Sequence, residues 1–261
     1  MITRNQAKRI RKLRTRKRRE EGAFLVEGVR LAEDLIASRL EVELVVSSPT
    51  LAGTERGRHL LDAMNDRGLT RAEVTEAELE DLADTETPQG VLAVAGEPIR
   101  QLEAFAPGQR AAVLVLDRIV DPGNLGTLMR TAHALGVGWV LALPGTVDPW
   151  SAKAVRASAG SLFQLPVSRE PWPEALSWLR GRDFAIFGAD PGGDPVARGG
   201  GLAPHPRFAL VLGNEPSGLS DEVRRDCDAE VAVRLPGRMD SLNVAIAGAL
   251  LLDRMLAGSE P

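Results

Sequence analysis

Three glycine-containing segments carry polar side chains that could bind a ligand or take part in catalysis. They read DRIVDPGNLGTLMRTAHALG at 117–136, GNEPSGLS at 213–220 and LPGRMDSLNVA at 235–245. Each segment follows an apolar run that predicts a buried strand, and ligands of open parallel sheets bind beyond the carboxyl ends of the strands. We therefore expect one binding site built from these loops, with Asn124 and Ser241 placed to cap the helices that follow.

The same segments disfavour several common chemistries. The first contains Gly123 and Gly126 but no GxGxxG sequence, and residues 137–143 offer no acidic group for a nucleotide ribose. A Walker lysine pattern and a GxSxG nucleophile elbow are also absent from the sequence. One cysteine, Cys227, and three scattered histidines do not make a metal-binding motif, so we expect no bound metal. These patterns argue against an NAD-dependent oxidoreductase, a nucleotide triphosphatase and a serine hydrolase.

Alternating strands and helices are expected to position the three loops. The strands are predicted at 111–116, 138–143, 184–189, 208–213 and 230–235, and the helices at 124–135, 153–161, 174–180 and 242–256. The glycine- and proline-rich stretch 191–207 is predicted to be a loop. Strands that are continuous apolar runs, separated by helices, are typical of a parallel sheet with helices on both faces. The fold class is therefore α/β.

The N-terminal part predicts a smaller α/β unit. Its helices are expected over 21–38, around Leu60 to Met64 and at Leu79 to Leu82, and its strands at 42–46 and 91–96. Periodicity then breaks down in a segment with two prolines and a glycine, which indicates a linker. We therefore predict an N-terminal domain over 1–96, a linker over 97–109 and a second domain over 110–261.

The net charge of −4 hides an uneven distribution. Residues 1–21 contain ten Lys and Arg and two Glu, which is +8, so the remaining 240 residues carry −12. Ile10 and Leu13 lie at helical spacing among these charges, so the segment predicts a basic amphipathic helix. A basic segment on an acidic protein indicates a polyanionic partner, most often a nucleic acid, although a solvated helix face is the alternative. Candidate phosphate contacts are Arg4, Lys8, Arg11 and Lys12, with Lys153 and Arg156 on one face of a later helix.

Taken together, the three loops resemble the three signature motifs of the SpoU/TrmH-like RNA 2′-O-ribose methyltransferases of the SPOUT superfamily. The resemblance rests on DPGNLGTLMRTA at 121–132, LGNEPSGLS at 212–220 and LPGRMDSLNVAIA at 235–247, with DPWSAKAVRASAGSLFQLPV at 148–167 between the first two. It covers 110–256 and extends loosely to the N-terminal part through FLVEG at 24–28 and TPQGVLAVA at 87–95. Pro216, Ser217 and Ala245 depart from the residues that are usual in the family.

The resemblance implies a C-terminal parallel sheet with a deep trefoil knot, a rare exception to the rule against threaded connections. It also implies a homodimer, a small N-terminal RNA-binding domain and S-adenosylmethionine as cofactor. Cofactor contacts would fall at Gly213, Leu235 and Leu242.

The resemblance also assigns catalytic candidates. Arg130 matches the family's catalytic arginine, and because an arginine is essentially always protonated, we expect it to hold the target phosphate and stabilise the developing alkoxide. Glu215 is expected to orient Arg130, and Asn124 to position the arginine and the ribose. Ser241 and Asn243 straddle the start of the last helix. A helix cap is the alternative role for the serine, and Asn243 is expected to bond Glu215 or the ribose.

The resemblance therefore implies an enzyme that methylates a ribose 2′-hydroxyl. The separate N-terminal domain favours ribosomal RNA over tRNA. The alternatives are a tRNA 2′-O-methyltransferase and a non-catalytic RNA-binding or ribosome-assembly protein of the same fold. The longest apolar stretch, Val244 to Leu252, is too short to cross a bilayer, and a lone cysteine fits a reducing cytoplasm.

Overall fold

The computed structural model describes residues 1–196, 205–235, 237 and 241–257. The chain forms two compact units. Unit 1 consists of Met1–Pro98 together with Pro149–Gln164, and unit 2 consists of Ile99–Asp148 together with Leu165–Pro261. Of the described helices, none is long and apolar enough to cross a membrane.

Unit 1 is built on a four-stranded sheet in the order β1-β4-β2-β3. The strands are β1 (Ala23–Glu27), β2 (Val42–Ser47), β3 (Arg71–Glu73) and β4 (Val91–Gly96). Strand β4 runs antiparallel to both of its neighbours, and β2 pairs with β3 in parallel. The two strands predicted at 42–46 and 91–96 are confirmed.

The helix expected over 21–38 is wrong in its first half. Residues Ala23–Glu27 form β1, all five of them buried, and the helix α2 begins only at Val29 and ends at Ala37. Four consecutive apolar residues, Ala23 to Val26, fit a strand that is covered on both faces as well as they fit one turn of a buried helix. Gly28, at φ 98°, then separates the strand from α2.

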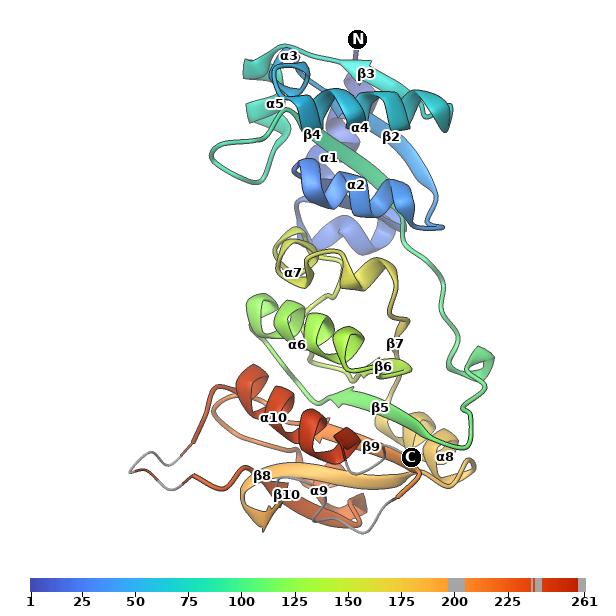
Figure 1. Cartoon of the computed structure of the whole chain (residues 1–261), viewed down its shortest axis with the longest axis vertical. Coiled ribbons are helices and arrows are strands. Elements are labelled where there is room, and N and C mark those ends of the chain that lie inside the picture. The colour runs from blue at the N-terminus through green and yellow to red at the C-terminus, as the bar shows by residue number, and fades with distance from the viewer. Residues whose placement is uncertain (197–204, 236, 238–240, 258–261) are drawn as a thin grey trace. The chain divides into compact units, whose positions relative to one another are not determined.

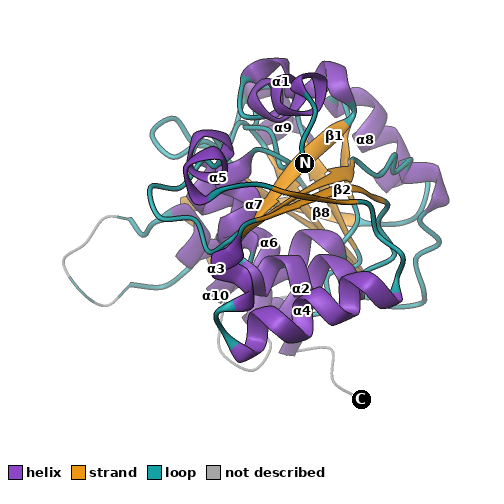
Figure 2. Cartoon of the chain, turned by 90° about the horizontal axis from the view of Figure 1, so that it is seen from above, coloured by secondary structure: helices purple, strands orange, loops and turns teal. Residues whose placement is uncertain are grey.

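Helices cover both faces of this sheet (Figure 2). Helix α1 (Arg4–Leu13) and helix α5 (Glu76–Leu82) lie on one face, while α2 and α4 (Glu55–Asp66) lie on the other. Ile10 and Leu13 are buried against the sheet, so the predicted basic amphipathic helix is confirmed. The short elements η1 (Arg16–Glu21) and α3 (Pro49–Ala52) complete the N-terminal piece.

The second piece of unit 1, residues 149–164, packs on β1. It contains α7 (Ala152–Ser158) and η3 (Ser161–Phe163). The Phe24 ring lies 4.5 Å from the Trp150 ring and 6.0 Å from the Phe163 ring, measured between centroids. The core of unit 1 is thus assembled from two pieces of chain that are separated by residues 99–148.

Unit 2 is built on a six-stranded parallel sheet in the order β10-β8-β9-β5-β6-β7 (Figure 1). The strands are β5 (Ala111–Leu116), β6 (Trp139–Ala142), β7 (Val167–Arg169), β8 (Ala185–Pro195), β9 (Arg207–Leu212) and β10 (Ala229–Ala232). Every pairing between them is parallel, as the apolar runs predicted. Strand β7 was not predicted, because three residues carry too little periodicity.

Strand β8 extends into residues that were predicted to be a loop. After a register shift between Glu230 and Val231, its end pairs with β10 through Asp194 and Pro195. A Cβ on Gly193 would lie only 2.6 Å from the carbonyl carbon of Glu230. The glycine therefore permits a close approach of two backbones, which is a common role of glycine inside a strand.

Helices flank this sheet as well. Helices α8 (Trp172–Arg180) and α9 (Asp221–Asp226) contribute Trp172, Trp178 and Val223 to a core on one face. Helix α10 (Val244–Ala257) packs on α6 (Pro122–Ala134) and on β9. A Cβ on Gly248 would lie 2.5 Å from Leu212 of β9 and 2.7 Å from Leu128 of α6. The linker region holds a single turn, η2 (Leu102–Ala104).

The sheet order decides where a site can form. From β5 the chain moves outward through β6 and β7, and it then returns to the other side of β5 as β8 and β9. The loops that leave β5 and β9 therefore meet at the point where the strand order reverses. Such a switch point is where open α/β sheets bind ligands.

Candidate functional site

The loop after β5 presents Asn124 at the start of α6. Asp121 caps this helix, since its side chain accepts a hydrogen bond from the Asn124 backbone N–H at 2.9 Å, and Pro122 occupies the first helical position. The expectation that Asn124 itself caps the helix is therefore wrong. Because Asp121 takes that role, the Asn124 side chain is available for other contacts.

The loop after β9 is a tight turn that carries Glu215 at its tip. Asn214 and Gly218 exchange two backbone hydrogen bonds, at 3.0 and 2.8 Å. A Cβ on Gly213 would lie 2.3 Å from the carbonyl carbon of Gly218, and Gly218 has φ of 65°. Both glycines are thus needed for the turn to close.

The start of α10 brings in Asn243. Its Oδ1 accepts hydrogen bonds from the backbone N–H groups of Ala245 at 2.9 Å and Ile246 at 3.3 Å, which is the geometry of a helix cap. The prediction that Ser241 caps this helix is wrong, because α10 begins at Val244 and the cap position falls on Asn243. Ser241 lies two residues earlier and is exposed.

Asn124 joins the three loops. Its Nδ2 donates to Glu215 Oε1 at 2.9 Å, and its Oδ1 accepts from Asn243 Nδ2 at 3.0 Å. Glu215 also accepts two long hydrogen bonds, at 3.4 Å each, from the backbone N–H groups of Val120 and Asp121. The residues predicted from three separate motifs thus form one continuous chain of hydrogen bonds.

The hydrogen bonds determine the charge of Glu215. Burial is the largest single influence and would raise the pKa of this carboxyl group. The hydrogen bonds from the Asn124 amide and from backbone N–H groups outweigh burial, so the pKa lies below its ordinary value of 4.5. Glu215 is therefore an ionised acceptor at neutral pH, where it can orient donors around it.

Arg130 does not join this chain of contacts. It lies on the exposed side of α6, about 9 Å further along the helix axis than Asn124. Within the part of the chain that the structure describes, Arg130 forms no ion pair, and the oxygens of Glu215 are occupied by Asn124 and backbone donors. The expected ion pair between Glu215 and Arg130 is therefore not formed.

The predicted cofactor contacts all lie in unit 2. Gly213 is buried directly after β9, and Leu235 and Leu242 are half-buried on the two sides of the third loop. Residues 236 and 238–240 of that loop lie outside the described residues. Gly213, Leu235 and Leu242 are themselves uncharged, which suits a cofactor held through backbone groups and apolar contacts.

The predicted RNA contacts all lie in unit 1 and differ in their partners. Arg4 and Lys8 are exposed and one turn apart on α1. Arg11 pairs with Asp81, while Lys12 pairs with Glu20 at 3.0 Å and Glu21 at 2.7 Å. On α7, Lys153 is exposed, and Arg156 pairs with Asp84 at 2.8 Å and lies 3.8 Å from Glu27. Internal acidic groups thus offset part of the predicted basic surface.

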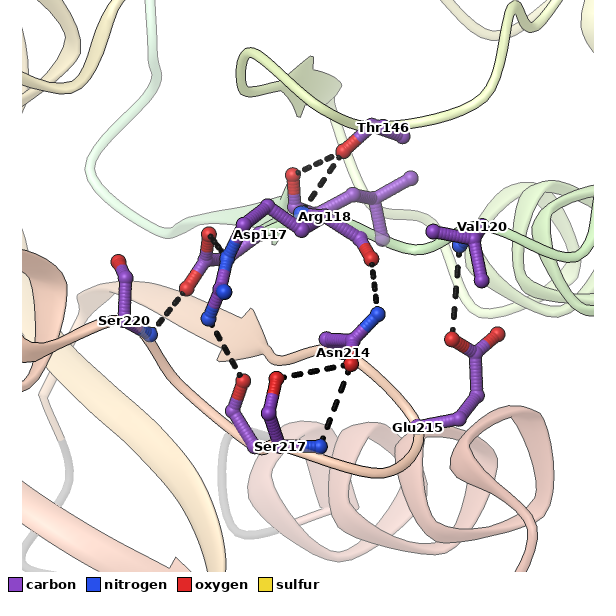
Figure 3. A network of polar contacts seen from close by, with 10 residues as sticks. Asp117, Arg118, Val120, Thr146, Asn214, Glu215, Ser217 and Ser220 are labelled. Carbon is purple, nitrogen blue, oxygen red and sulfur yellow. Dashed lines mark hydrogen bonds and ion pairs between the residues drawn. The ribbon is translucent and has the colours of Figure 1, made fainter.

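A second polar cluster beside the site was missed from the sequence (Figure 3). It joins residues of the loops that follow β5, β6 and β9: Asp117, Arg118, Thr146, Asn214, Ser217 and Ser220. Partners such as Asp117 and Ser220 are about a hundred residues apart, so no local pattern reveals them. The position of Asn214 next to Glu215 was the only available signal.

Comparisons with known proteins show which family this chain belongs to. Residues 111–253 match the SpoU rRNA Methylase family, and residues 4–93 match the MRM3-like substrate binding domain. The chain is 32% identical over 245 residues to the 23S rRNA (guanosine(2553)-2'-O)-methyltransferase RlmP of Bacillus subtilis, covering 93% of this chain and 92% of that protein. It is 31% identical over 242 residues to the 23S rRNA (uridine(2479)-2'-O)-methyltransferase of Streptomyces viridochromogenes, covering 90% of this chain and 83% of that one.

Solved structures show the same likeness. The SpoU methyltransferase AviRb of Streptomyces viridochromogenes, in complex with AdoMet, superposes with a TM-score of 0.85 at 28% identity, covering 97% of each chain. An AdoMet-bound rRNA methyltransferase of Sinorhizobium meliloti gives 0.84 at 29% identity, covering 98% of this chain and 95% of that one. Since the family match spans most of unit 2 and includes all three loops of the site, this chain belongs to the SpoU rRNA Methylase family.

Proposed function

We propose that this protein transfers a methyl group from S-adenosylmethionine to a ribose 2′-hydroxyl of ribosomal RNA. The observation that carries the proposal is the convergence of Asn124, Glu215 and Asn243, one from each of the three family motifs, in one chain of hydrogen bonds. Two relatives that each align with at least 90% of this chain are named as 23S rRNA 2'-O-methyltransferases, which favours rRNA over tRNA. A non-catalytic RNA-binding role would not require this arrangement.

The cofactor would be held by Gly213, Leu235 and Leu242. When bound, it would supply a methyl group that is activated by the positive charge of its sulfur. Arg130 would bind the phosphate next to the target ribose and stabilise negative charge that develops on the 2′-oxygen. An arginine remains protonated, so it is not the base. Asn124, held by Glu215 and Asn243, would help to orient the ribose, and Ser241 would face the same region. Orientation of this kind can contribute several kcal/mol to lowering a barrier.

We also propose that the protein is a homodimer in which α10 lies at the interface. The sequence of this helix, VAIAGALLLDRMLA, is apolar on almost every side, and such helices are normally covered all round. In the single chain only Ala245, Gly248, Leu251 and Leu252 are buried, while Ile246 is 53% exposed. On the basis of the family resemblance, we propose that the chain also forms the trefoil knot. The single cysteine favours a cytoplasmic location.

The direct test is methyl transfer by the purified protein. Radiolabelled S-adenosylmethionine should label 23S rRNA, the label should lie on a ribose 2′-oxygen, and calorimetry should show cofactor binding. Labelling of tRNA in preference to rRNA would contradict the choice of substrate. Cofactor binding or RNA binding without transfer to either RNA would contradict the proposed enzyme activity.

Unit 1 is proposed to bind the RNA, with Arg4 and Lys8 making phosphate contacts. Each phosphate contact releases counterions, so removing two contacts should lower RNA affinity. The slope of log affinity against log salt concentration should become less steep by about two units. The double variant Arg4→Gln/Lys8→Gln is therefore expected to show the flatter slope between about 50 and 200 mM salt.

The matched control is Arg11→Gln/Lys12→Gln, which removes the same charge from residues already paired with Asp81, Glu20 and Glu21. It should change the slope less than the first pair. Equal slopes for the wild type and the Arg4/Lys8 variant would contradict the proposed contacts. Deleting residues 1–21 is not a suitable test, because it would remove Ile10 and Leu13 from the core of unit 1.

A further inference from the structure

The loops that follow β5 and β9 are bonded to each other beside the candidate site. Asn214 Nδ2 donates to the carbonyl oxygen of Arg118 at 2.9 Å, and the Ser220 N–H donates to Asp117 Oδ2 at 2.6 Å. Arg118 adds a third bond, from its guanidinium to the carbonyl oxygen of Gly218 at 3.2 Å. Figure 3 shows that these bonds surround the base of the loop that carries Glu215.

The orientation of the Asn214 amide is defined on both sides. Its Oδ1 accepts hydrogen bonds from the Ser217 N–H at 3.2 Å and the Ser217 hydroxyl at 2.8 Å. The amide nitrogen must therefore face Arg118, because the reversed amide would set its oxygen against a carbonyl oxygen. Asn214 is thus bonded within its own loop on one side and to the neighbouring loop on the other.

Asp117 and Arg118 provide the other half of the connection. The Asp117 side chain is 4% exposed, and its second oxygen accepts from Arg118 Nε at 3.1 Å. Arg118 has a left-handed backbone with φ of 59°, which is unfavourable for a residue with a side chain. This conformation directs the Arg118 N–H to the Thr146 hydroxyl at 3.0 Å and the carbonyl oxygen to Asn214.

Glu215 makes one short bond across the loops, the 2.9 Å bond from Asn124 Nδ2, and its other contacts with the first loop are long. Its two bonds to the backbone of the first loop are 3.4 Å long, which is near the limit for a hydrogen bond. The bonds made by Asp117 and Asn214 are shorter by at least 0.5 Å, since they measure 2.6 and 2.9 Å against 3.4 Å. Asp117 and Asn214 therefore hold the base of the loop by bonds that do not involve Glu215, and the loop position that they set decides whether Glu215 can reach Asn124.

We propose that Asn214 and Asp117 are positioning residues for methyl transfer, which hold Glu215 where its carboxylate can bond to Asn124. This inference rests on the proposed function. Neither residue touches a reacting atom; each acts through Glu215. A displacement of about 1 Å in a catalytic site can reduce a rate by 10²-fold, so releasing this loop has a large effect on turnover.

The test is a double-mutant cycle in the full-length protein. Asn214→Asp keeps the acceptor for Ser217 and the size of the side chain, but it removes the donor to Arg118. It is expected to lower kcat by about 10²-fold and to leave KM for the cofactor and the RNA within a few-fold. In a Glu215→Gln background, the same change should add almost no further loss, because the residue through which it acts is already altered.

Two controls separate positioning from stability. Ser217→Ala removes a hydrogen bond to Asn214 inside the loop and leaves the bonds between the loops, so its kcat should stay close to that of the wild type. Thermal unfolding and cofactor calorimetry on every variant show whether the protein is folded. If Asn214→Asp does not fold, the same cycle is carried out with Asp117→Asn, which weakens the bond to Ser220.

The outcomes are distinct. Losses that multiply in the double variant, or an equal loss in Ser217→Ala, would overturn the positioning role and leave the enzyme activity intact. Absence of methyl transfer by the wild-type protein would refute the proposed function itself. A loss confined to kcat that disappears in the Glu215→Gln background supports the inference.

Discussion

Replacing Arg130 with alanine is expected to reduce methyl transfer by about 10²- to 10³-fold, the loss typical for removing one group that stabilises developing negative charge. The side chain is exposed on α6 and lies outside the hydrogen bonds of Asn124. Its removal should therefore change the free energy of unfolding by less than about 0.5 kcal/mol. Affinity for S-adenosylmethionine should stay within a few-fold, since the proposed cofactor contacts are on other loops.

Arg130→Lys distinguishes a planar guanidinium from a simple positive charge. A lysine carries the same charge but cannot form two parallel hydrogen bonds to a phosphate, so we expect it to fail nearly as severely as alanine. His133→Ala, an exposed position on the same helix, is the matched control and should behave like the wild type. Single-turnover rates with saturating RNA and cofactor measure the effect. Nearly normal rates for the lysine variant would contradict the proposed role.

Asn243→Asp is expected to separate the stability of α10 from the activity of the site. The aspartate oxygen can still accept from the N–H groups of Ala245 and Ile246, and its charge suits a helix N-terminus. Stability should therefore be kept or slightly increased. Activity should fall by about 10²-fold, because the donor to Asn124 Oδ1 is lost and two acceptors face each other.

A flip of the Asn124 amide cannot relieve this repulsion, since it would turn the oxygen toward Glu215. Asn243→Ala provides the comparison. It should lose both the cap, at about 1 kcal/mol, and the activity. Unfolding curves and methyl-transfer rates on both variants check the prediction. If the aspartate variant were active, the contact between Asn243 and Asn124 would not contribute to catalysis.

The sequence predicted the elements of unit 2 well because its strands are uninterrupted apolar runs. AAVLVL at 111–116 corresponds to β5 at every residue, and the loops after it were correctly placed at one end of a parallel sheet. The site residues Asn124, Glu215 and Asn243 could be selected because their motifs are distinctive. Their mutual hydrogen bonds could not be predicted, since they depend on which of two polar neighbours caps each helix. Asp121 rather than Asn124, and Asn243 rather than Ser241, take that role.

The electrostatic predictions were limited for a related reason. Ten positive charges near the N-terminus indicated a polyanion partner, but the sequence did not show that Asp81 pairs with Arg11. The same holds for Arg156, whose partner Asp84 comes from a distant part of the chain. Pairing over such separations depends on how β1, α5 and α7 pack, which local periodicity does not encode.

The two-piece core of unit 1 has a consequence for how the protein is made. Synthesis runs from the N-terminus, so residues 1–98 leave the ribosome while Trp150 and Phe163 have not yet been added. At about 5 to 20 residues per second, the apolar side of Phe24 stays uncovered for several seconds. Folding of unit 1 is therefore completed only after the first two strands of the sheet in unit 2 have been translated. A fragment that ends at Pro98 would keep this apolar surface exposed and aggregate, whereas one that carries 149–164 on a tether could cover it.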